Sequence, residues 1–232
     1  MTAPSSRIVP IRQNSAAGSG SSVHAETLKM RRERILDVAM QAFARHGFEG
    51  ASLPKIAHDA GTKHPNILYH FESKEGLWRA AIDHAFSHER ERLLAITQTA
   101  KDLDPLAMLK VMVRATVHFA HRHPLHFAIV MQECQSPSPR FDWLVTHHLQ
   151  PIHRQFNAVA KAAILAGQLK RVAPASLAMI LLGAINSFFA MPALVEMLYE
   201  CNPADEKSAL DHADWIIESI FRGIEIEPAS RG

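Results

Sequence analysis

The stretch from Ser52 to Leu77 constrains the fold of this 232-residue chain more than any other feature. Ser52 is a favourable N-cap residue, because its hydroxyl can accept an amide proton that the first helical turn leaves unbonded. Gly61 predicts the end of that short helix, since glycine adopts a positive φ at no steric cost. A second short helix is predicted over 62–71, with Pro65 in its first turn. Two short helices joined by a glycine-containing turn form a helix-turn-helix arrangement.

The second helix of such a pair enters the major groove of DNA, so polar residues in and beside it are candidate DNA contacts. Asparagine can pair bidentately with adenine, and lysine can donate to guanine acceptors. The base-edge candidates are Thr62, Lys63, His64, Asn66 and Tyr69, and the phosphate candidates are Ser52, Tyr69, His70 and Lys74. Ile67, Leu68 and Phe71 are expected in the core.

Several spacings in this stretch resemble the signature of tetracycline-repressor-type (TetR) regulators of bacteria. The matching residues are Ile56-Ala57, Ala60-Gly61, Tyr69-His70-Phe71, Ser73-Lys74-Glu75 and Leu77. The resemblance covers about residues 28–86 and departs from the usual pattern at Thr62, Lys63, Pro65 and Leu68. It implies a homodimer that binds a palindromic double-stranded DNA operator and is released by a small-molecule effector.

The expected fold is all-α, with about nine helices in a three-helix head and a helical body. Residues 1–25, rich in Ser, Ala and Gly, are expected to be a disordered arm that is either a solvated leader or a further DNA contact. Residues 26–75 are the expected DNA-binding domain, 76–226 a ligand-sensing and dimerisation domain, and 227–232 a tail. Residues 1–85 carry a net charge of +3 and the remainder −1, which fits a DNA-contacting head on another body.

Helix boundaries follow from local signals. The first helix is expected from about Thr27 to His46 and is closed by Gly47. Its cations Lys29, Arg31, Arg32 and Arg34 either form a solvated face or lie near the phosphate backbone. Ser73 predicts the start of a helix that runs to about Thr99. Proline after a capping residue predicts further starts near residues 104, 123 and 138, and Pro151 and Pro192 predict bends inside long helices.

Aromatic, thioether and thiol side chains of the body could line an apolar cavity, although each one taken singly is also explained by core packing. The candidates are Phe119, Phe127, Met131, Cys134, Trp143, His147, Phe156, Phe188, Phe189 and Met191. Clustered histidines (His118, His121, His123, His126, His147, His148 and His153) raise a metal-binding alternative, but no ligand spacing supports it, so neither a metal nor a cofactor is expected.

The last two long helices carry apolar residues on more than one face, which indicates a partner outside the subunit. With the resemblance, they are interpreted as half of an intersubunit four-helix bundle. The interface candidates are Gly183, Ser187, Ala190, Ala213, Ile217 and Ile220. The alternative is that these helices only complete the monomer core.

Other function classes find little support in the sequence. The longest apolar stretch, 177–198, is interrupted by Asn186, Pro192 and Glu196, so no membrane span is expected. Two cysteines and no signal-peptide layout favour the cytoplasm. No nucleophile–base pair or phosphate-binding glycine loop indicates an enzyme. An activator or effector-independent regulator with the same head stays open, and an all-helical enzyme or scaffold is a remote alternative.

Overall fold

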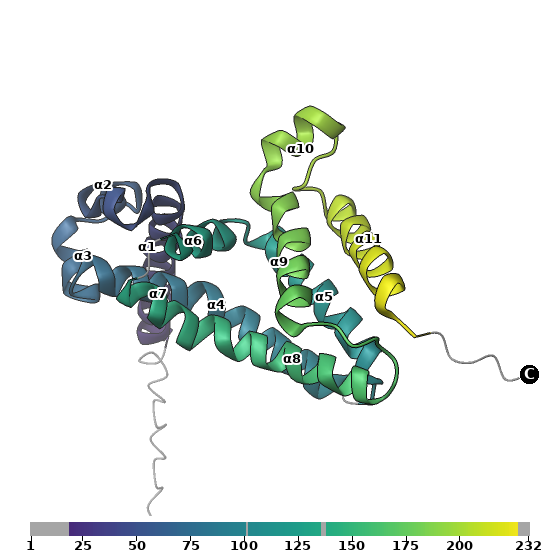
Figure 1. Ribbon diagram of the computed structural model, residues 1–232. Helices are drawn as coiled ribbons and strands as arrows, with labels where there is room; N and C mark the ends of the chain where they lie inside the picture. The colour runs from purple at the N-terminus through teal and green to yellow at the C-terminus, as the bar shows by residue number, and fades with distance from the viewer. Residues whose placement is uncertain (1–18, 101, 136–137, 227–232) are drawn as a thin grey trace, which may run out of the picture.

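The computed structural model describes residues 19–100, 102–135 and 138–226, and these form eleven α-helices, one π-helix and no strand (Figure 1). The all-α prediction is confirmed. The first four helices are α1 (Ser19–Gly50), α2 (Leu53–Asp59), α3 (His64–Phe71) and α4 (Lys74–Thr99). The rest are α5 (Pro105–Arg122), α6 (Leu125–Cys134), α7 (Pro139–Leu144), the π-helix η1 (Val145–Leu149), α8 (Gln150–Leu165), α9 (Pro174–Ala190), α10 (Pro192–Tyr199) and α11 (Glu206–Ile224).

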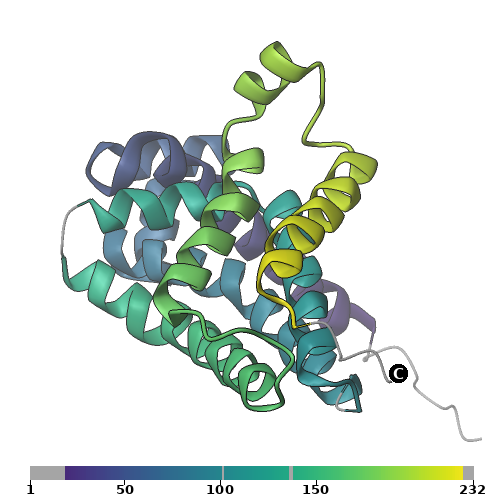
Figure 2. The ribbon, with the colours of Figure 1, turned by 45° about the vertical axis from the view of Figure 1, so that its right-hand side comes forward.

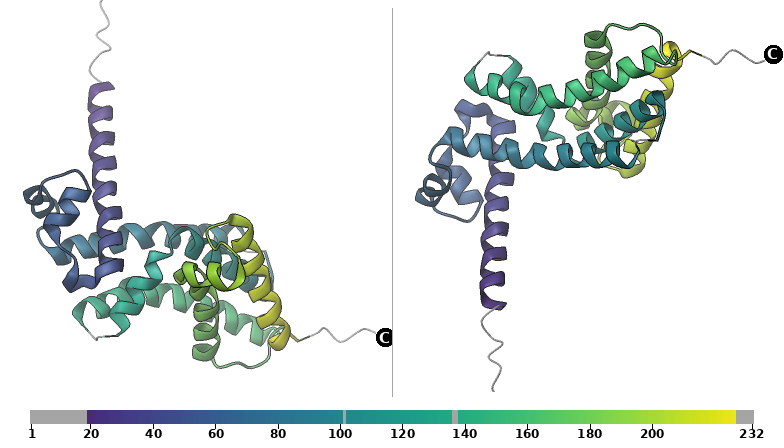
Figure 3. Two further views of the ribbon diagram at one scale, coloured as in Figure 1. Left: turned by 90° about the horizontal axis from the view of Figure 1, so that it is seen from above. Right: turned by 90° about the horizontal axis from the view of Figure 1, so that it is seen from below.

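Helix α1 is longer than predicted. It begins at Ser19 rather than Thr27, so residues 19–25 of the expected disordered arm are helical, whereas residues 1–18 and 227–232 lie outside the described residues. Extending an existing helix costs less than starting one, which explains why the Ser- and Ala-containing segment continues it. Gly47, with φ 68°, breaks the helix as predicted. The first half of α1 projects beyond the other helices (Figure 3).

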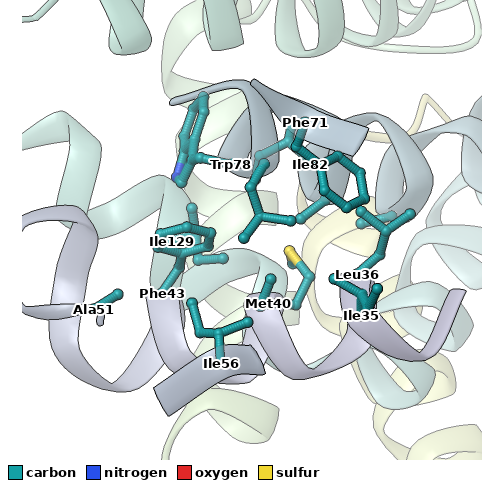
Figure 4. Close-up of a cluster of buried hydrophobic side chains, with 14 of the residues drawn as sticks. Ile35, Leu36, Met40, Phe43, Ala51, Ile56, Phe71, Trp78, Ile82 and Ile129 are labelled. Atoms are coloured by element: carbon teal, nitrogen blue, oxygen red, sulfur yellow. The ribbon is translucent and has the colours of Figure 1, made fainter. Parts of the chain in front are cut away.

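The core of the head is also packed against the body. Phe43 of α1, Ile56 of α2 and Trp78 of α4 are almost fully buried together, and Ile129 of α6 joins the same cluster (Figure 4). The side-chain amide Nε2 of Gln132 donates to the backbone carbonyl of Ala44 over 2.7 Å. Helix α6 therefore contributes to the core around α1, α2 and α4.

Two prolines raise the helix number from about nine to eleven. Pro151 lies in the first turn of α8, directly after η1, where wider π-turns accommodate the missing proline N–H. Pro192 does more than bend its helix: α9 and α10 meet at 79°, with Met191 in a non-helical conformation between them. The proline ring and its missing N–H exclude a continuous α-helix at this point.

A second core lies between α5, α8, α9 and α11, around Leu109, Leu181, Ile185 and Phe221. Helix α10 stands away from these helices (Figure 2). Among the described helices, none is by itself both long and apolar enough to cross a bilayer. The bent pair α9–α10 meets that test only when its two members are taken together, and only by length and composition.

Candidate nucleic-acid interface and body cavities

Helix α3 lies at the end of the molecule farthest from α11, where Figure 1 and Figure 3 show it exposed. Ile67 and Phe71 are buried and anchor it to the head, as predicted. Tyr69 is 83% exposed, and Leu68 is also exposed, so the prediction of Leu68 in the core is wrong. Residue 68 follows the inward-facing residue 67 by about 100° around the helix, which turns it outward.

The N-terminus of α3 carries the base-edge candidates. The helix begins at His64 rather than Thr62, and Lys63 is the extended N-cap residue. Lys63 and Asn66 are exposed, whereas Thr62 and His64 are partly buried. The side-chain amide Nδ2 of Asn66 donates to Thr62 Oγ1 over 3.2 Å. This bond orients the Asn66 side chain, while its carbonyl oxygen and second amide hydrogen are not used by it.

The phosphate candidates occupy three different elements. Ser52 is the exposed N-cap of α2, but its side chain accepts no capping bond, contrary to the prediction. Pro54 at the second helical position has no N–H, which removes one of the usual donors to such a cap. Exposed His70 contacts Tyr69, with 5.2 Å between ring centroids. Lys74 Nζ donates to the Glu49 carbonyl over 2.9 Å, so this ammonium is partly committed within the head.

The junction between α3 and α4 is tightly packed. Ser73 Oγ accepts a hydrogen bond from the Gly76 amide over 2.9 Å and caps α4 as predicted. A Cβ on Gly76 would collide with the backbone carbonyl oxygen of Phe71. The close approach of the two helices, rather than a positive φ, therefore requires glycine at position 76.

The cations of α1 extend the positive surface beside α3. Lys29, Arg31 and Arg34 are exposed. The guanidinium of Arg32 lies 5.6 Å from the ring centroid of Phe71 at the end of α3. This contact brings positive charge from α1 close to the helix that carries the base-edge candidates.

Two adjoining cavities lie in the body between α5, α6, α8 and α9, with volumes of about 100 and 120 Å³. They share the wall residues Thr116, Ile152, His153 and Leu182, and together are named the body cavities. Phe119, Phe127 and Phe156 line them, as the sequence suggests. Lining residues that the sequence analysis missed are Phe86, Met112, Val113, Thr116, Val130, Leu149, Ile152, Ala178, Leu181, Leu182, Ile185 and Asn186, together with His126 and His153, which it had considered only as metal ligands.

The other seven cavity candidates line neither body cavity, and each has another role. Trp143 packs against Trp78 of α4, and His147 is exposed with Nδ1 bonded to the Trp143 carbonyl. Phe188 stacks on His212, whereas Phe189 belongs to the second core. Met131, Cys134 and Met191 are exposed. Sequence periodicity identifies an apolar face, but it does not show which part of that face borders a cavity.

His126 and His153 are the titratable residues in the cavity walls. His126 is buried, and its Nδ1 lies 2.9 Å from the His123 carbonyl oxygen. Burial lowers the pKa of His126 to about 4, more than the nearby backbone carbonyls raise it. Burial also lowers the pKa of His153. Both imidazoles are therefore neutral near pH 7. No group of three or more His, Cys, Asp or Glu side chains among the described residues could hold a metal ion.

The dimer candidates fall into two groups. Gly183 and Ala190 are exposed on α9, with Ser187 partly exposed on the same face. Ala213 and Ile217 are only 3% and 8% exposed, so these two belong to the subunit interior and correct the expectation for α11, whereas Ile220 is partly exposed and packs against the same core. The stripe of α11 that they form faces α5 and α9. The exposed apolar residues nearby are Met179 and Ile180 of α9 and Leu210 and Trp215 of α11.

Comparison with known proteins agrees with this geometry. Residues 35–81 match the family of bacterial regulatory proteins of the tetR type, and residues 102–229 match the tetracyclin repressor-like C-terminal domain. The HTH-type transcriptional regulator RutR of Escherichia coli K12 is 24% identical over 200 residues, which cover 86% of this chain and 93% of RutR.

Solved structures share the fold. The ketosteroid transcriptional regulator KstR2 of Mycobacterium tuberculosis has a TM-score of 0.69 and 18% identity, covering 85% of this chain and 96% of that one. AibR, solved with isovaleryl coenzyme A and operator DNA, has a TM-score of 0.65 and 18% identity, covering 82% and 98%. With a helix-turn-helix head and a C-terminal domain that both match, this chain belongs to the TetR family of DNA-binding transcriptional regulators.

Proposed function

We propose that this regulator is a homodimeric repressor, working in the cytoplasm without enzymatic activity, that a small-molecule effector releases from a palindromic DNA operator. The observation that carries the proposal is the orientation of α3. Its apolar residues Ile67 and Phe71 hold it on the head, while Lys63, Asn66 and Tyr69 face outward at the end of the molecule. A short, exposed, polar helix after a tight turn is the element that reads base edges in helix-turn-helix proteins.

The contacts divide by chemistry. Asn66 and Lys63 are proposed to read base edges, because amide and ammonium groups match adenine and guanine in the major groove. Ser52, His70 and Lys74 are proposed to contact phosphates, with the α1 cations adding sequence-independent attraction. Tyr69 serves either role. Together they would position α3 and read a short half-site.

Helix α6 offers a physical route from the body cavities to the head. His126, Phe127 and Val130 line one of the body cavities, while Ile129 on the same helix is buried in the core of the head. Gln132 also bonds the Ala44 carbonyl of α1. A ligand that shifts α6 would therefore shift α1 as well. Such a ligand releases DNA only if it binds the non-DNA-binding conformation more tightly.

The dimer is proposed to form through the exposed faces of α9 and α11, around Met179, Gly183 and Trp215. A two-fold dimer places two copies of α3 on half-sites of one operator, which is why a palindromic sequence is expected. The exposed residues of α9 and α11 are apolar and lie beside the subunit core, so association of two subunits would remove these side chains from water.

The test is selection of genomic fragments by the purified full chain, followed by fluorescence anisotropy on the enriched sequence. Enrichment of a palindrome, with affinity that falls as salt rises, is expected. Failure to enrich any sequence above a control protein would contradict the proposal. Transcript levels of adjacent genes in a deletion strain then separate repression from activation: repressed genes rise and activated genes fall.

A further inference from the structure

The size of the body cavities limits what they can bind. Their volumes are about 100 and 120 Å³, and Thr116, Ile152, His153 and Leu182 belong to the walls of both. An apolar cavity of about 150 Å³ is large enough to hold benzene. Each body cavity is somewhat smaller than this, so it suits at most a molecule of about one aromatic ring.

The walls are also uncharged. None of the described side chains that line the body cavities is Asp, Glu, Lys or Arg. An ion that left water for this site would lose its hydration without gaining a partner of opposite charge. Phe86 and Phe119 instead offer aromatic surfaces, with their ring centroids 6.2 Å apart, which suit another ring.

One wall residue, His126, has a buried polar atom without a hydrogen-bond partner. The Nδ1 of His126 lies 2.9 Å from the His123 carbonyl oxygen, and since that oxygen has no hydrogen, Nδ1 must carry the proton. In the neutral ring Nε2 is then a bare acceptor. This Nε2 is buried and makes no hydrogen bond of good geometry in the described part of the chain, although the Ala85 carbonyl, like that of His123, lies near enough to the ring to raise its pKa. A buried acceptor without a partner is costly, and a guest with a donor would relieve that cost.

Two other polar side chains of the walls already make hydrogen bonds within the subunit. Thr116 Oγ1 donates to the Met112 carbonyl over 2.9 Å, and Asn186 Nδ2 donates to the Leu182 carbonyl over 2.9 Å. His153 is only partly buried and lies in the wall common to both cavities. His126 also borders the groove next to Asp37 and His84.

We propose that the body cavities bind an uncharged molecule of about one aromatic ring, whose hydroxyl or N–H group donates a hydrogen bond to Nε2 of His126. Burial keeps this acceptor unprotonated at neutral pH, since the pKa of His126 is about 4. The inference rests on the proposed function only where it identifies the bound molecule as the effector. Binding to the cavity is a separate property from release of DNA.

Calorimetry on the full chain at pH 7.5, without DNA, tests the cavity with four probes of similar size. They are para-cresol (neutral donor), toluene (no donor), benzoate (anion) and benzylammonium (cation). Para-cresol is expected to bind about 2- to 10-fold more tightly than toluene, the range of one net hydrogen bond. Neither ion is expected to bind. Failure of para-cresol to bind at millimolar concentration, or tighter binding of either ion, would overturn the proposal.

Substitutions of single histidines test which side chain accepts the hydrogen bond from para-cresol. The preference for para-cresol over toluene should vanish in His126→Leu and persist in His147→Leu, because His147 is exposed and lies outside the cavities. His153→Leu tests the other imidazole of the walls. Loss of the preference in His153→Leu, with the preference kept in His126→Leu, would make His153 the acceptor and refute the role of His126. If His126→Leu does not fold, the nitrogen-15 shift of Nε2 in the wild-type chain gives the same answer. A shift on adding para-cresol, absent with toluene, supports the bond, and no shift refutes it.

Anisotropy on operator DNA separates this inference from the proposed function. Para-cresol that binds in calorimetry and leaves DNA affinity unchanged would support the cavity and contradict effector release. Loss of DNA binding without any calorimetric signal would contradict the cavity and leave the DNA-binding role intact.

Discussion

At the scale of single residues, Asn66 and Lys74 are expected to affect DNA binding differently. Asn66→Ala should cost about 1–3 kcal/mol at the operator and relax the preference at one base position, because an amide pairs with one base. Lys74→Met should weaken all sequences alike and reduce the salt slope by about one unit, because it removes one phosphate contact.

Anisotropy across operator variants at several salt concentrations measures both effects. Lys161→Ala, which removes an exposed lysine of α8 far from the head, is the matched control. Lys74 also bonds the Glu49 carbonyl, so its variant requires a check of folding by circular dichroism. Indistinguishable behaviour of the Asn66 and Lys74 variants on all operators would show that the division into base and phosphate contacts is wrong.

His126 gives the protein a predicted pH dependence of stability. Its pKa falls from 6.5 to about 4 on folding, chiefly through burial, with His123 and His84 adding repulsion. The unfolded chain therefore takes up the proton first as the pH drops. The stabilisation is complete above about pH 6.5 and is lost as the pH falls towards 4, by about 3 kcal/mol in total.

Urea unfolding at pH 7.5 and pH 5 measures this dependence. His126→Gln should lose less stability between the two pH values than the wild-type chain, because it removes one group that the unfolded state protonates preferentially. Carboxylates and other histidines titrate equally in both proteins and cancel in the comparison. An equal loss in both proteins would contradict the buried neutral state of His126.

At the scale of elements, the junction of α3 and α4 should tolerate little change. Gly76→Ala is expected to destabilise the chain by about 1–3 kcal/mol or more, because the new methyl collides with the Phe71 carbonyl. Ser73→Ala should cost about 1 kcal/mol through the lost cap.

Gly223→Ala in α11 is the matched control, because a Cβ there meets open space. It should stabilise the chain by about 0.5–1 kcal/mol, as alanine does for glycine inside a helix. Thermal and urea denaturation compare the variants. Similar stabilities of the Gly76 and Gly223 variants would show that the close approach at Phe71 is not required.

The sequence predicts helix starts well, because capping is local. Asp104 and Ser138 each accept the amide proton that their position suggests. The sharp break before Pro192 and the π-turns before Pro151 were predicted only as bends, since their size depends on surrounding packing. Helix α9 carries apolar residues on both its buried and its exposed face. Periodicity therefore could not separate residues facing the cavity, such as Leu182, from those facing outward, such as Ile180.

At the scale of the whole molecule, the proposed dimer should depend on exposed residues of α9 and α11. Trp215 is 66% exposed and Met179 lies on the adjacent helix. Trp215→Glu combined with Met179→Glu should shift the chain to a monomer at micromolar concentration and weaken operator binding, because two linked heads bind more tightly than one. Light scattering after size exclusion measures the mass.

Leu165→Glu changes a still more exposed apolar residue at the end of α8 and should leave the mass of the assembly unchanged. A wild-type chain that is strictly monomeric at this concentration would contradict the dimer. A dimer that survives the double substitution would place the interface on another surface, such as the apolar side of α10.

The bond from Gln132 to Ala44 and the burial of Ile129 beside Phe43 have a consequence for protein engineering. The DNA-reading part is not a self-contained cassette, because one of its buried side chains is supplied by α6, after α4 and α5 in the chain. A chimaera that grafts only α1 to α4 onto a foreign scaffold would leave a void where Ile129 sits and an unmatched carbonyl at Ala44. Transplanted DNA specificity should therefore require α6 to travel with the graft.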